Sequence, residues 1–218
     1  MEELFQFYQE REPDIKKNTV NWRIFELVKG FVLRRVGRGL FELGKEVPFY
    51  PHISEYIIEI GNFIKDRFPY ASFCVWESAI LNEFAQHLSG HSFVLVDVER
   101  DVAESVYYRL KEQFKSVFYR LNNITMADVL PDFDHPVLVR NLVSEGPLSY
   151  NGTVPTVSLE KLLGDIFCDP EFSFLQGSEM QAVYRNVFSK YTVNTTKLLR
   201  YAARKGKKKE IKQFINQL

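Results

Sequence analysis

The chain has 218 residues, of which 45% are hydrophobic and 26% charged, and its 28 basic and 28 acidic residues give a formal net charge of zero. This composition is typical of a soluble globular protein and excludes a disordered or fibrous one, and the length fits one large domain or two modest ones. No run of about 18 apolar residues is present, which excludes a helical membrane span. The acidic start does not resemble a signal peptide, and two distant cysteines, Cys74 and Cys168, predict neither a disulfide framework nor a zinc cluster. We therefore expect a cytoplasmic protein.

The charges are distributed unevenly along the chain. Residues 1–45 carry nine basic and seven acidic residues, residues 46–196 carry 11 and 20, and residues 197–218 carry eight and one. Within the first block, residues 16–38 hold seven basic residues against a single acidic one, Glu26. This asymmetry predicts that the ends of the chain contact a polyanion while the acidic middle faces away. The alternative for either basic run is a solvated surface.

The first fifty residues predict two helices and a β-hairpin. Residues 3–10 have the pattern of a short helix that ends before a proline. A second helix is predicted over residues 18–30, because apolar residues recur at helical spacing between a cap at Asn18-Thr19 and a C-terminal glycine. Strand-like runs at 31–36 and 40–43 then flank the turn Gly37-Arg38-Gly39.

Two helices followed by a basic hairpin follow the order of a winged helix-turn-helix, so we expect such a DNA-binding domain over residues 1–47. A winged helix has three helices before its wing, and residues 13–17 are the candidate for an additional helical turn. The second helix would present donors to base edges, while arginines of the wing would neutralise phosphates or enter the minor groove. The candidate DNA-binding residues are Lys16, Lys17, Thr19, Asn21, Arg23, Arg34, Arg35 and Arg38.

Several aromatic residues accompany these basic ones. We expect Trp22 and Phe25 to pack against the neighbouring helix or the second domain rather than to contact DNA. Tyr184, Tyr191 and Tyr201 could stack on nucleotides, but their helical spacing favours positions in the core.

Residues 52–218 predict a mixed α/β domain, so the whole chain is expected to be α+β. Helices at 52–68, 77–87, 101–114 (capped by Asp101) and 158–168 (capped by Ser158) are interspersed with strands at 71–75, 91–98, 116–121 and 136–143. Residues 145–155 are rich in glycine, proline and asparagine and predict a loop or turn. The C-terminus is expected to be helical over 177–190, 195–204 and 207–217.

The last two of these helices carry a second basic patch. Its candidate roles are a solvated face, a second phosphate contact and a docking surface for an acidic partner. Its residues are Lys197, Arg200, Arg204, Lys205, Lys207, Lys208, Lys209 and Lys212.

We find no motif for catalysis. The sequence has no phosphate-binding glycine loop, no nucleophile elbow and no His-Glu-x-x-His zinc motif. The best carboxylate pair is Asp97-x-Glu99, whose spacing on a strand could hold a hydrolytic metal as a nuclease requires. No lysine stands at the next alternate position, where Asp101 is found. We therefore expect neither an enzyme nor a cofactor or metal, with a metal-dependent nuclease as a remote alternative.

The run from Asn18 to Leu43 resembles the winged-helix region of AbiE-type antitoxins from bacterial abortive-infection systems, with Arg38-Gly39-Leu40-Phe41 matching the basic wing. Residues 71–81 and 157–167 are similar to that family's strand-to-helix entry and late helix. The resemblance implies a two-domain transcriptional autoregulator that binds inverted repeats in its own promoter. It also implies an antitoxin domain that opposes a nucleotidyltransferase toxin, directly or indirectly. The DNA contacts carried over are Thr19, Asn21, Arg23, Arg34, Arg35 and Arg38.

The leading hypothesis is therefore a DNA-binding antitoxin without enzymatic activity. The alternative is a protein–protein interaction module that does not bind DNA, in which the acidic middle and the basic tail dock a partner or a second copy.

Overall fold

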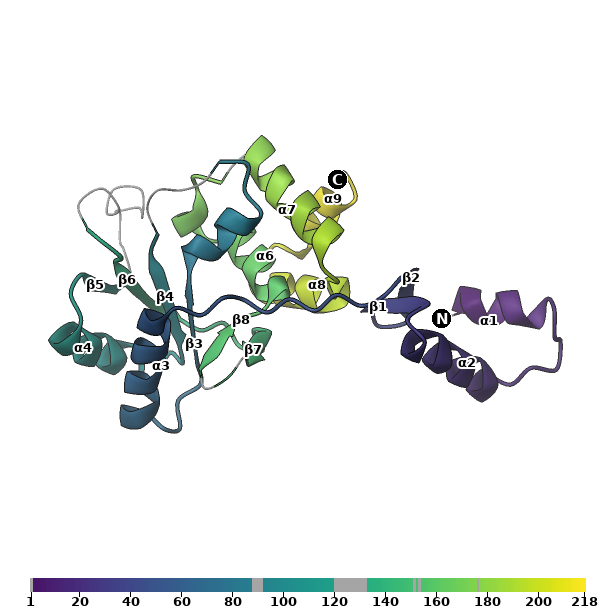
Figure 1. Ribbon diagram of the computed structural model, residues 1–218, viewed down its shortest axis with the longest axis horizontal. Coiled ribbons are helices and arrows are strands. Elements are labelled where there is room, and N and C mark those ends of the chain that lie inside the picture. The colour runs from purple at the N-terminus through teal and green to yellow at the C-terminus, as the bar shows by residue number, and fades with distance from the viewer. Residues whose placement is uncertain (1, 88–91, 120–132, 151, 153, 176) are drawn as a thin grey trace.

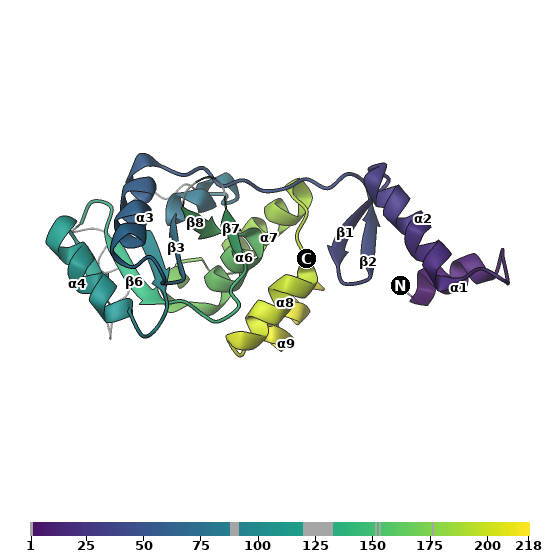
Figure 2. The same cartoon turned by 90° about the horizontal axis from the view of Figure 1, so that it is seen from below.

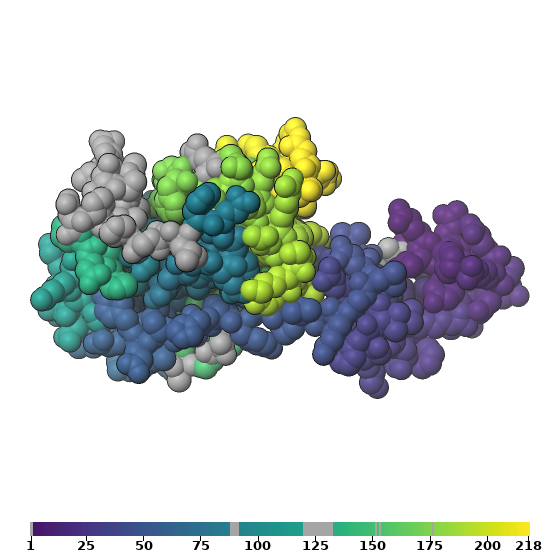
Figure 3. Space-filling model, turned by 45° about the horizontal axis from the view of Figure 1, so that its top comes forward, coloured from purple at the N-terminus to yellow at the C-terminus, as the bar shows by residue number. Residues whose placement is uncertain are grey.

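The computed structural model describes residues 2–87, 92–119, 133–150, 152, 154–175 and 177–218. The chain forms an N-terminal lobe (residues 2–43) and a larger body (residues 55–218), joined by an extended segment (Figure 1). Figure 3 shows the lobe projecting from the body. The expected α+β class is confirmed.

The lobe contains α1 (Glu2–Gln9), α2 (Lys17–Lys29) and a hairpin of β1 (Leu33–Gly37) and β2 (Leu40–Leu43). Val20 and Ile24 are the buried side chains of α2. The strands pair antiparallel, with Arg34 opposite Glu42. Helix α2 begins one residue before the expected cap: Lys16 is its N-cap, and no side chain caps it. Two helices precede the hairpin within residues 2–43, and residues 13–14 form a turn instead of a further helix.

The body is built on a four-stranded sheet. Its strands are β3 (Phe73–Glu77), β4 (Val94–Val98), β6 (Val137–Asn141) and β5 (Val117–Tyr119), in that order across the sheet. β3 is antiparallel to β4, whereas β4, β6 and β5 are parallel. Helices α3 (Glu55–Arg67) and α4 (Ala103–Gln113) cover one face, where Ile60 and Leu110 pack against Val96 and its neighbours.

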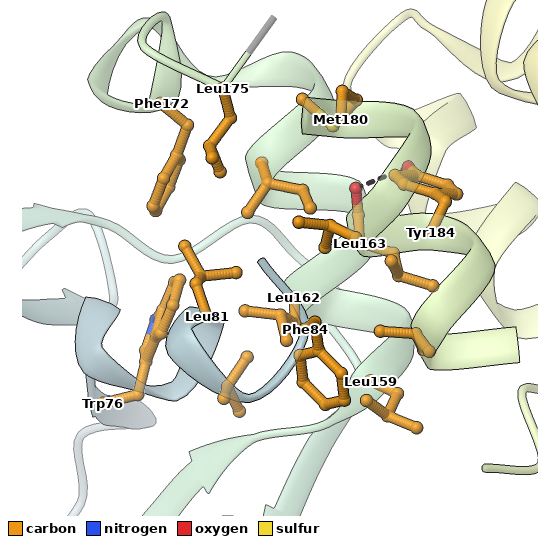
Figure 4. Close-up of a cluster of buried hydrophobic side chains, with 14 of the residues drawn as sticks. Trp76, Leu81, Phe84, Leu159, Leu162, Leu163, Phe172, Leu175, Met180 and Tyr184 are labelled. Atoms are coloured by element: carbon orange, nitrogen blue, oxygen red, sulfur yellow. Dashed lines mark hydrogen bonds between the residues drawn. The ribbon is translucent and has the colours of Figure 1, made fainter. Parts of the chain in front are cut away.

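The other face of the sheet is covered by the C-terminal helices. These are α6 (Leu159–Cys168), the short η2 (Pro170–Phe172), α7 (Ser178–Lys190), α8 (Thr195–Arg204) and α9 (Lys208–Ile215). Figure 4 shows part of the core that they build, in which Trp76 and Phe172 stack with ring centroids 5.7 Å apart. Tyr184 donates a hydrogen bond to the carbonyl oxygen of Leu163 at 2.8 Å. The predicted three-helix tail is confirmed, and Ser158 caps α6 as expected by accepting a hydrogen bond from the backbone of Lys161.

Four other sequence predictions need correction. The expected helix over 77–87 is a 3-10 helix, η1 (Ser78–Glu83), which follows β3 directly. Helix α4 begins at Ala103 without a side-chain cap, so Asp101 does not cap it. The predicted loop at 145–155 contains a second hairpin, β7 (Leu148–Tyr150) with β8 (Pro155–Val157), whose strands are too short for a period-2 pattern to reveal. The helix expected from residue 52 begins at Glu55, with Ser54 as its cap.

Some expected positions lie outside the described residues, namely the end of the predicted strand at 120–121 and His91 at the start of another. Among the described residues, no helix combines the length and the apolar character that crossing a bilayer requires.

Candidate nucleic-acid interface

The tip of the N-terminal hairpin docks on the start of α8. The Thr195 hydroxyl donates to the backbone oxygen of Val36 at 3.0 Å, and the Arg38 backbone N–H donates to the Thr196 hydroxyl at 3.0 Å. Figures 1 and 2 both place the hairpin beside α8. Residues from opposite ends of the sequence therefore share one surface.

A glycine permits this contact. Gly37 is buried at the hairpin tip, and a Cβ atom added there would lie 2.6 Å from the Thr196 hydroxyl and 3.0 Å from the Leu40 side chain. Just beyond the hairpin, Val47 and Thr192 exchange two further hydrogen bonds of 2.9 Å. The hairpin of the lobe and the extended segment that follows it are thus both hydrogen-bonded to the body.

Exposed basic residues continue from this contact along α8. Lys197, Arg200 and Arg204 are spaced three and four residues apart, so they lie on one face of the helix. All three are exposed, as is Arg38 on the hairpin. The two basic ends of the chain therefore come together, although Arg38 and Thr196 are 158 residues apart in the sequence.

The basic residues of the hairpin differ in how they are engaged. Arg34 donates to Glu42 across the hairpin at 2.9 Å, so this guanidinium is partly neutralised. Arg35 lies over the ring of Phe41 with its guanidinium carbon 5.3 Å from the centroid. Within the described part of the chain, Arg35 and Arg38 form no ion pair.

The predicted DNA-contact residues on and just before α2 also differ in how far other side chains engage them. Arg23 makes a bidentate pair with Glu12 at 2.7 and 2.9 Å, which lowers the pKa of the Glu12 carboxyl. The Lys17 ammonium lies 5.4 Å from the centre of the Phe5 ring. The remaining candidates are exposed on the surface and are Lys16, Thr19 and Asn21.

The expectation that Trp22 and Phe25 pack against the neighbouring helix or the second domain is wrong. Their exposed fractions are 62% and 59%. The physical reason is the position of Val20 and Ile24, which form the buried face of α2, while Trp22 and Phe25 point the opposite way. The short α1 covers little of α2, because none of its own side chains is buried. The expected core positions of Tyr184 and Tyr201 are confirmed, whereas Tyr191 is only partly buried.

The C-terminal patch loses one predicted member. Lys205 has only 8% of its side chain exposed, because it follows Tyr201 by one turn on the buried face of α8. Two other members are paired at the surface, Arg204 with Glu145 at 2.6 Å and Lys207 with Glu210 at 3.3 Å. The remaining members on α9 are exposed and are Lys208, Lys209 and Lys212.

Lys205 belongs instead to a buried ion cluster that fixes α8 to the body. Its ammonium lies 2.8 Å from Asp165 and 2.6 Å from Asp169. Lys161 of α6 bonds Asp97 of β4 at 2.6 Å and also contacts Asp165. Arg140 of β6 completes the cluster, with contacts of 2.8 Å to Asp97 and 2.9 Å to Asp169. Strands, α6, α8 and the segment after α6 are thereby joined through charged groups.

Opposite charges favour the ionised forms of Asp97, Asp165 and Lys161 despite their burial. Burial raises the pKa of Asp97, but Arg140 and Lys161 outweigh burial and hold that pKa below its usual value. Lys161, Lys205 and Arg140 likewise hold the pKa of Asp165 well below its usual range. Burial lowers the pKa of Lys161, yet Asp165 and Asp97 raise it well above the usual value, so Lys161 is charged.

Neutral hydrogen bonds complete the cluster. Tyr201 of α8 donates to Asp165 at 2.6 Å, and the indole of Trp76 donates to Asp97 at 3.3 Å. The sequence contained two signals for the cluster. Lys161 and Asp165 stand four residues apart in a mostly apolar helix, so they share a face, and Asp97 is an acidic residue within an apolar strand. The cations Arg140 and Lys205 come from distant parts of the chain and have no local signal that pairs them with these carboxylates.

The proposed carboxylate pair is not brought together. Asp97 is buried, and its oxygens are held by Arg140, Lys161 and Trp76. Glu99 lies beyond the end of β4 and is exposed. Within the described ranges, no three histidine, cysteine or acidic residues are grouped as metal ligands.

The chain belongs to a family described as "Family of unknown function (DUF6577)", which matches residues 19–218. This match includes α2 from Thr19 onward, the hairpin and the whole body and leaves out α1. No curated protein and no solved structure matches the chain.

Proposed function

We propose that the protein binds double-stranded DNA as a transcriptional regulator. In this proposal the N-terminal lobe is a winged helix-turn-helix, with α2 as the recognition helix and the β1–β2 hairpin as the wing. The wing and α8 together contact the phosphate backbone. The protein acts in the cytoplasm without a cofactor or catalytic activity.

One observation supports this proposal above the others: the hairpin tip lies on α8. The contact between Arg38 and Thr196 brings the basic segment 16–38 beside the basic C-terminus. Arg35, Arg38, Lys197 and Arg200 are exposed there, and positively charged side chains on one surface favour a polyanion through counterion release. Because the hairpin tip is occupied by Thr196, we expect its arginines to bind phosphates rather than to insert the tip into a groove.

The antitoxin role is a second part of the proposal and rests on the resemblance of residues 18–43, 71–81 and 157–167 to AbiE-type antitoxins. It would make the DNA target the protein's own promoter and the opposed partner a nucleotidyltransferase toxin. This part is tested by co-expression with the product of the neighbouring gene. The proposal predicts that the neighbouring product arrests growth alone and that the present chain restores growth. Continued arrest in the presence of soluble chain would contradict the antitoxin role while leaving DNA binding intact.

DNA binding is tested by fluorescence anisotropy with DNA from upstream of the gene and a shuffled duplex of equal length. We expect tighter binding to the upstream DNA, with an affinity that falls steeply as salt rises. Equal affinity for both duplexes would contradict a specific regulator, and no binding to either at low salt would contradict a DNA-binding protein.

The interface is tested by Arg38→Ala. Loss of one phosphate contact is expected to weaken binding to both duplexes and to reduce the salt slope by about one. The matched control is Lys65→Ala, which removes one exposed positive charge from α3 at the far end of the body (Figure 1). Equal losses in the two variants would show that net charge, rather than this surface, determines the affinity.

A further inference from the structure

The outward face of α2 carries an apolar centre with polar ends. Asn18, Trp22, Phe25 and Lys29 are spaced four, three and four residues apart, so they form one stripe along the helix. All four are exposed, and the stripe lies opposite the buried Val20 and Ile24. We call these four residues the outward stripe.

Charge around the outward stripe favours an anionic partner. Lys16 and Lys17 precede it, Lys29 ends it, and all three are exposed. Glu26 flanks the stripe and is the single acidic residue among residues 16–38. A partner that fits must therefore combine negative charge at the edges with apolar groups at the centre. The major groove of DNA does so, because phosphates border a floor on which thymine displays its methyl group.

The structure also reduces the role expected of Arg23. This guanidinium is engaged in the bidentate pair with Glu12, at 2.7 and 2.9 Å, and so points toward the segment between α1 and α2 rather than along the outward stripe. Arginine would otherwise be the residue type that reads guanine. With Arg23 engaged, the side chains at the centre of the outward stripe are the aromatic ones of Trp22 and Phe25.

We infer that Trp22 and Phe25 read thymine methyl groups in the major groove, with Asn18 placed to bond an adjacent adenine. The inference rests on the proposed DNA binding and adds the base preference: a target rich in A·T pairs. Apolar contact with the thymine methyl and paired hydrogen bonds from asparagine to adenine are the interactions that these side chain types make with base edges.

The test replaces thymine by deoxyuridine in the bound duplex, which removes the methyl groups and keeps base pairing and backbone charge. For the wild-type chain we expect the affinity to fall about four-fold for each contacted methyl group. Phe25→Ala and Trp22→Ala should bind the thymine duplex more weakly than wild type. They should also show a smaller difference between the two duplexes, because the contact that senses the methyl group is gone.

Arg38→Ala is the matched control, since it lies on the hairpin rather than on α2. It should bind both duplexes more weakly but keep the wild-type ratio between thymine and deoxyuridine DNA. Urea unfolding of each variant checks that the lobe is intact, and little change is expected because Trp22 and Phe25 are exposed.

The outcomes separate the inference from the proposed function. Wild-type binding that is specific but indifferent to deoxyuridine would overturn methyl reading and leave the DNA-binding proposal standing. Absence of any DNA binding would overturn both. Unchanged DNA affinity in Trp22→Ala and Phe25→Ala would also overturn the inference, and loss of co-purification with a protein partner in those variants would then identify the stripe as a protein-docking face.

Discussion

Lys161 has 1% of its side chain exposed, yet it carries a charge. The ammonium is accommodated because Asp97 and Asp165 lie within bonding distance, and each carboxylate has a further cation in Arg140 or Lys205. Buried charges of this kind contribute little stability as a complete set, but removing one member leaves the others unpaired in a low-dielectric interior.

Lys161→Met tests this arrangement because methionine preserves much of the volume and removes the charge. We expect the free energy of unfolding to fall by about 3–5 kcal/mol, measured by urea titration. Lys208→Met on the exposed face of α9 is the control, with an expected change within about 0.5 kcal/mol. Similar losses in the two variants would argue that the buried ammonium has no special role.

At the scale of elements, α8 serves two surfaces at once. Its buried face carries Tyr201 and Lys205 into the ion cluster, and its exposed face carries Lys197 and Arg200. Its first turn receives the hairpin through Thr196. The cluster therefore determines where α8 sits, and α8 in turn determines where the hairpin sits.

Thr196→Val tests the hairpin contact, since valine keeps the shape and removes the acceptor of the Arg38 N–H bond. We expect hydrogen exchange at the Arg38 amide to accelerate about five-fold, the equivalent of about 1 kcal/mol for one hydrogen bond. NMR-detected exchange measures this rate. Ser189→Ala is the control, because that hydroxyl bonds Asn186 within its own helix. An Arg38 amide that exchanges equally fast in both variants would show that Thr196 does not hold the hairpin.

At the scale of the whole molecule, sequence reasoning succeeded where the signal was local. The C-terminal helices were predicted within about two residues because caps and the 3.6-residue period are properties of neighbouring residues. It failed for Lys205, which was assigned to the exposed patch, because its partners come from α6 and the segment that follows it. Sequence reasoning also failed for Trp22, because the burial of this side chain depends on whether another element covers that face of α2. The proximity of the two basic ends of the chain could also not be predicted from the sequence, because it depends on the tertiary structure.

The whole molecule should lose stability in acid through the ion cluster. The pKa values of Asp97 and Asp165 are below their ordinary range in the folded chain, so the unfolded chain binds more protons as pH falls through about 4. The contribution of the two carboxylates is therefore complete above about pH 5 and is lost progressively below it. Asp169 opposes this trend in part, since burial and Asp165 raise its pKa. Urea midpoints between pH 7 and 2.5 measure the loss, and Asp165→Asn should reduce the acid slope by up to about 1.4 kcal/mol per pH unit. Parallel curves for wild type and variant below pH 4 would show that Asp165 does not titrate with folding and that another set of carboxylates governs acid stability.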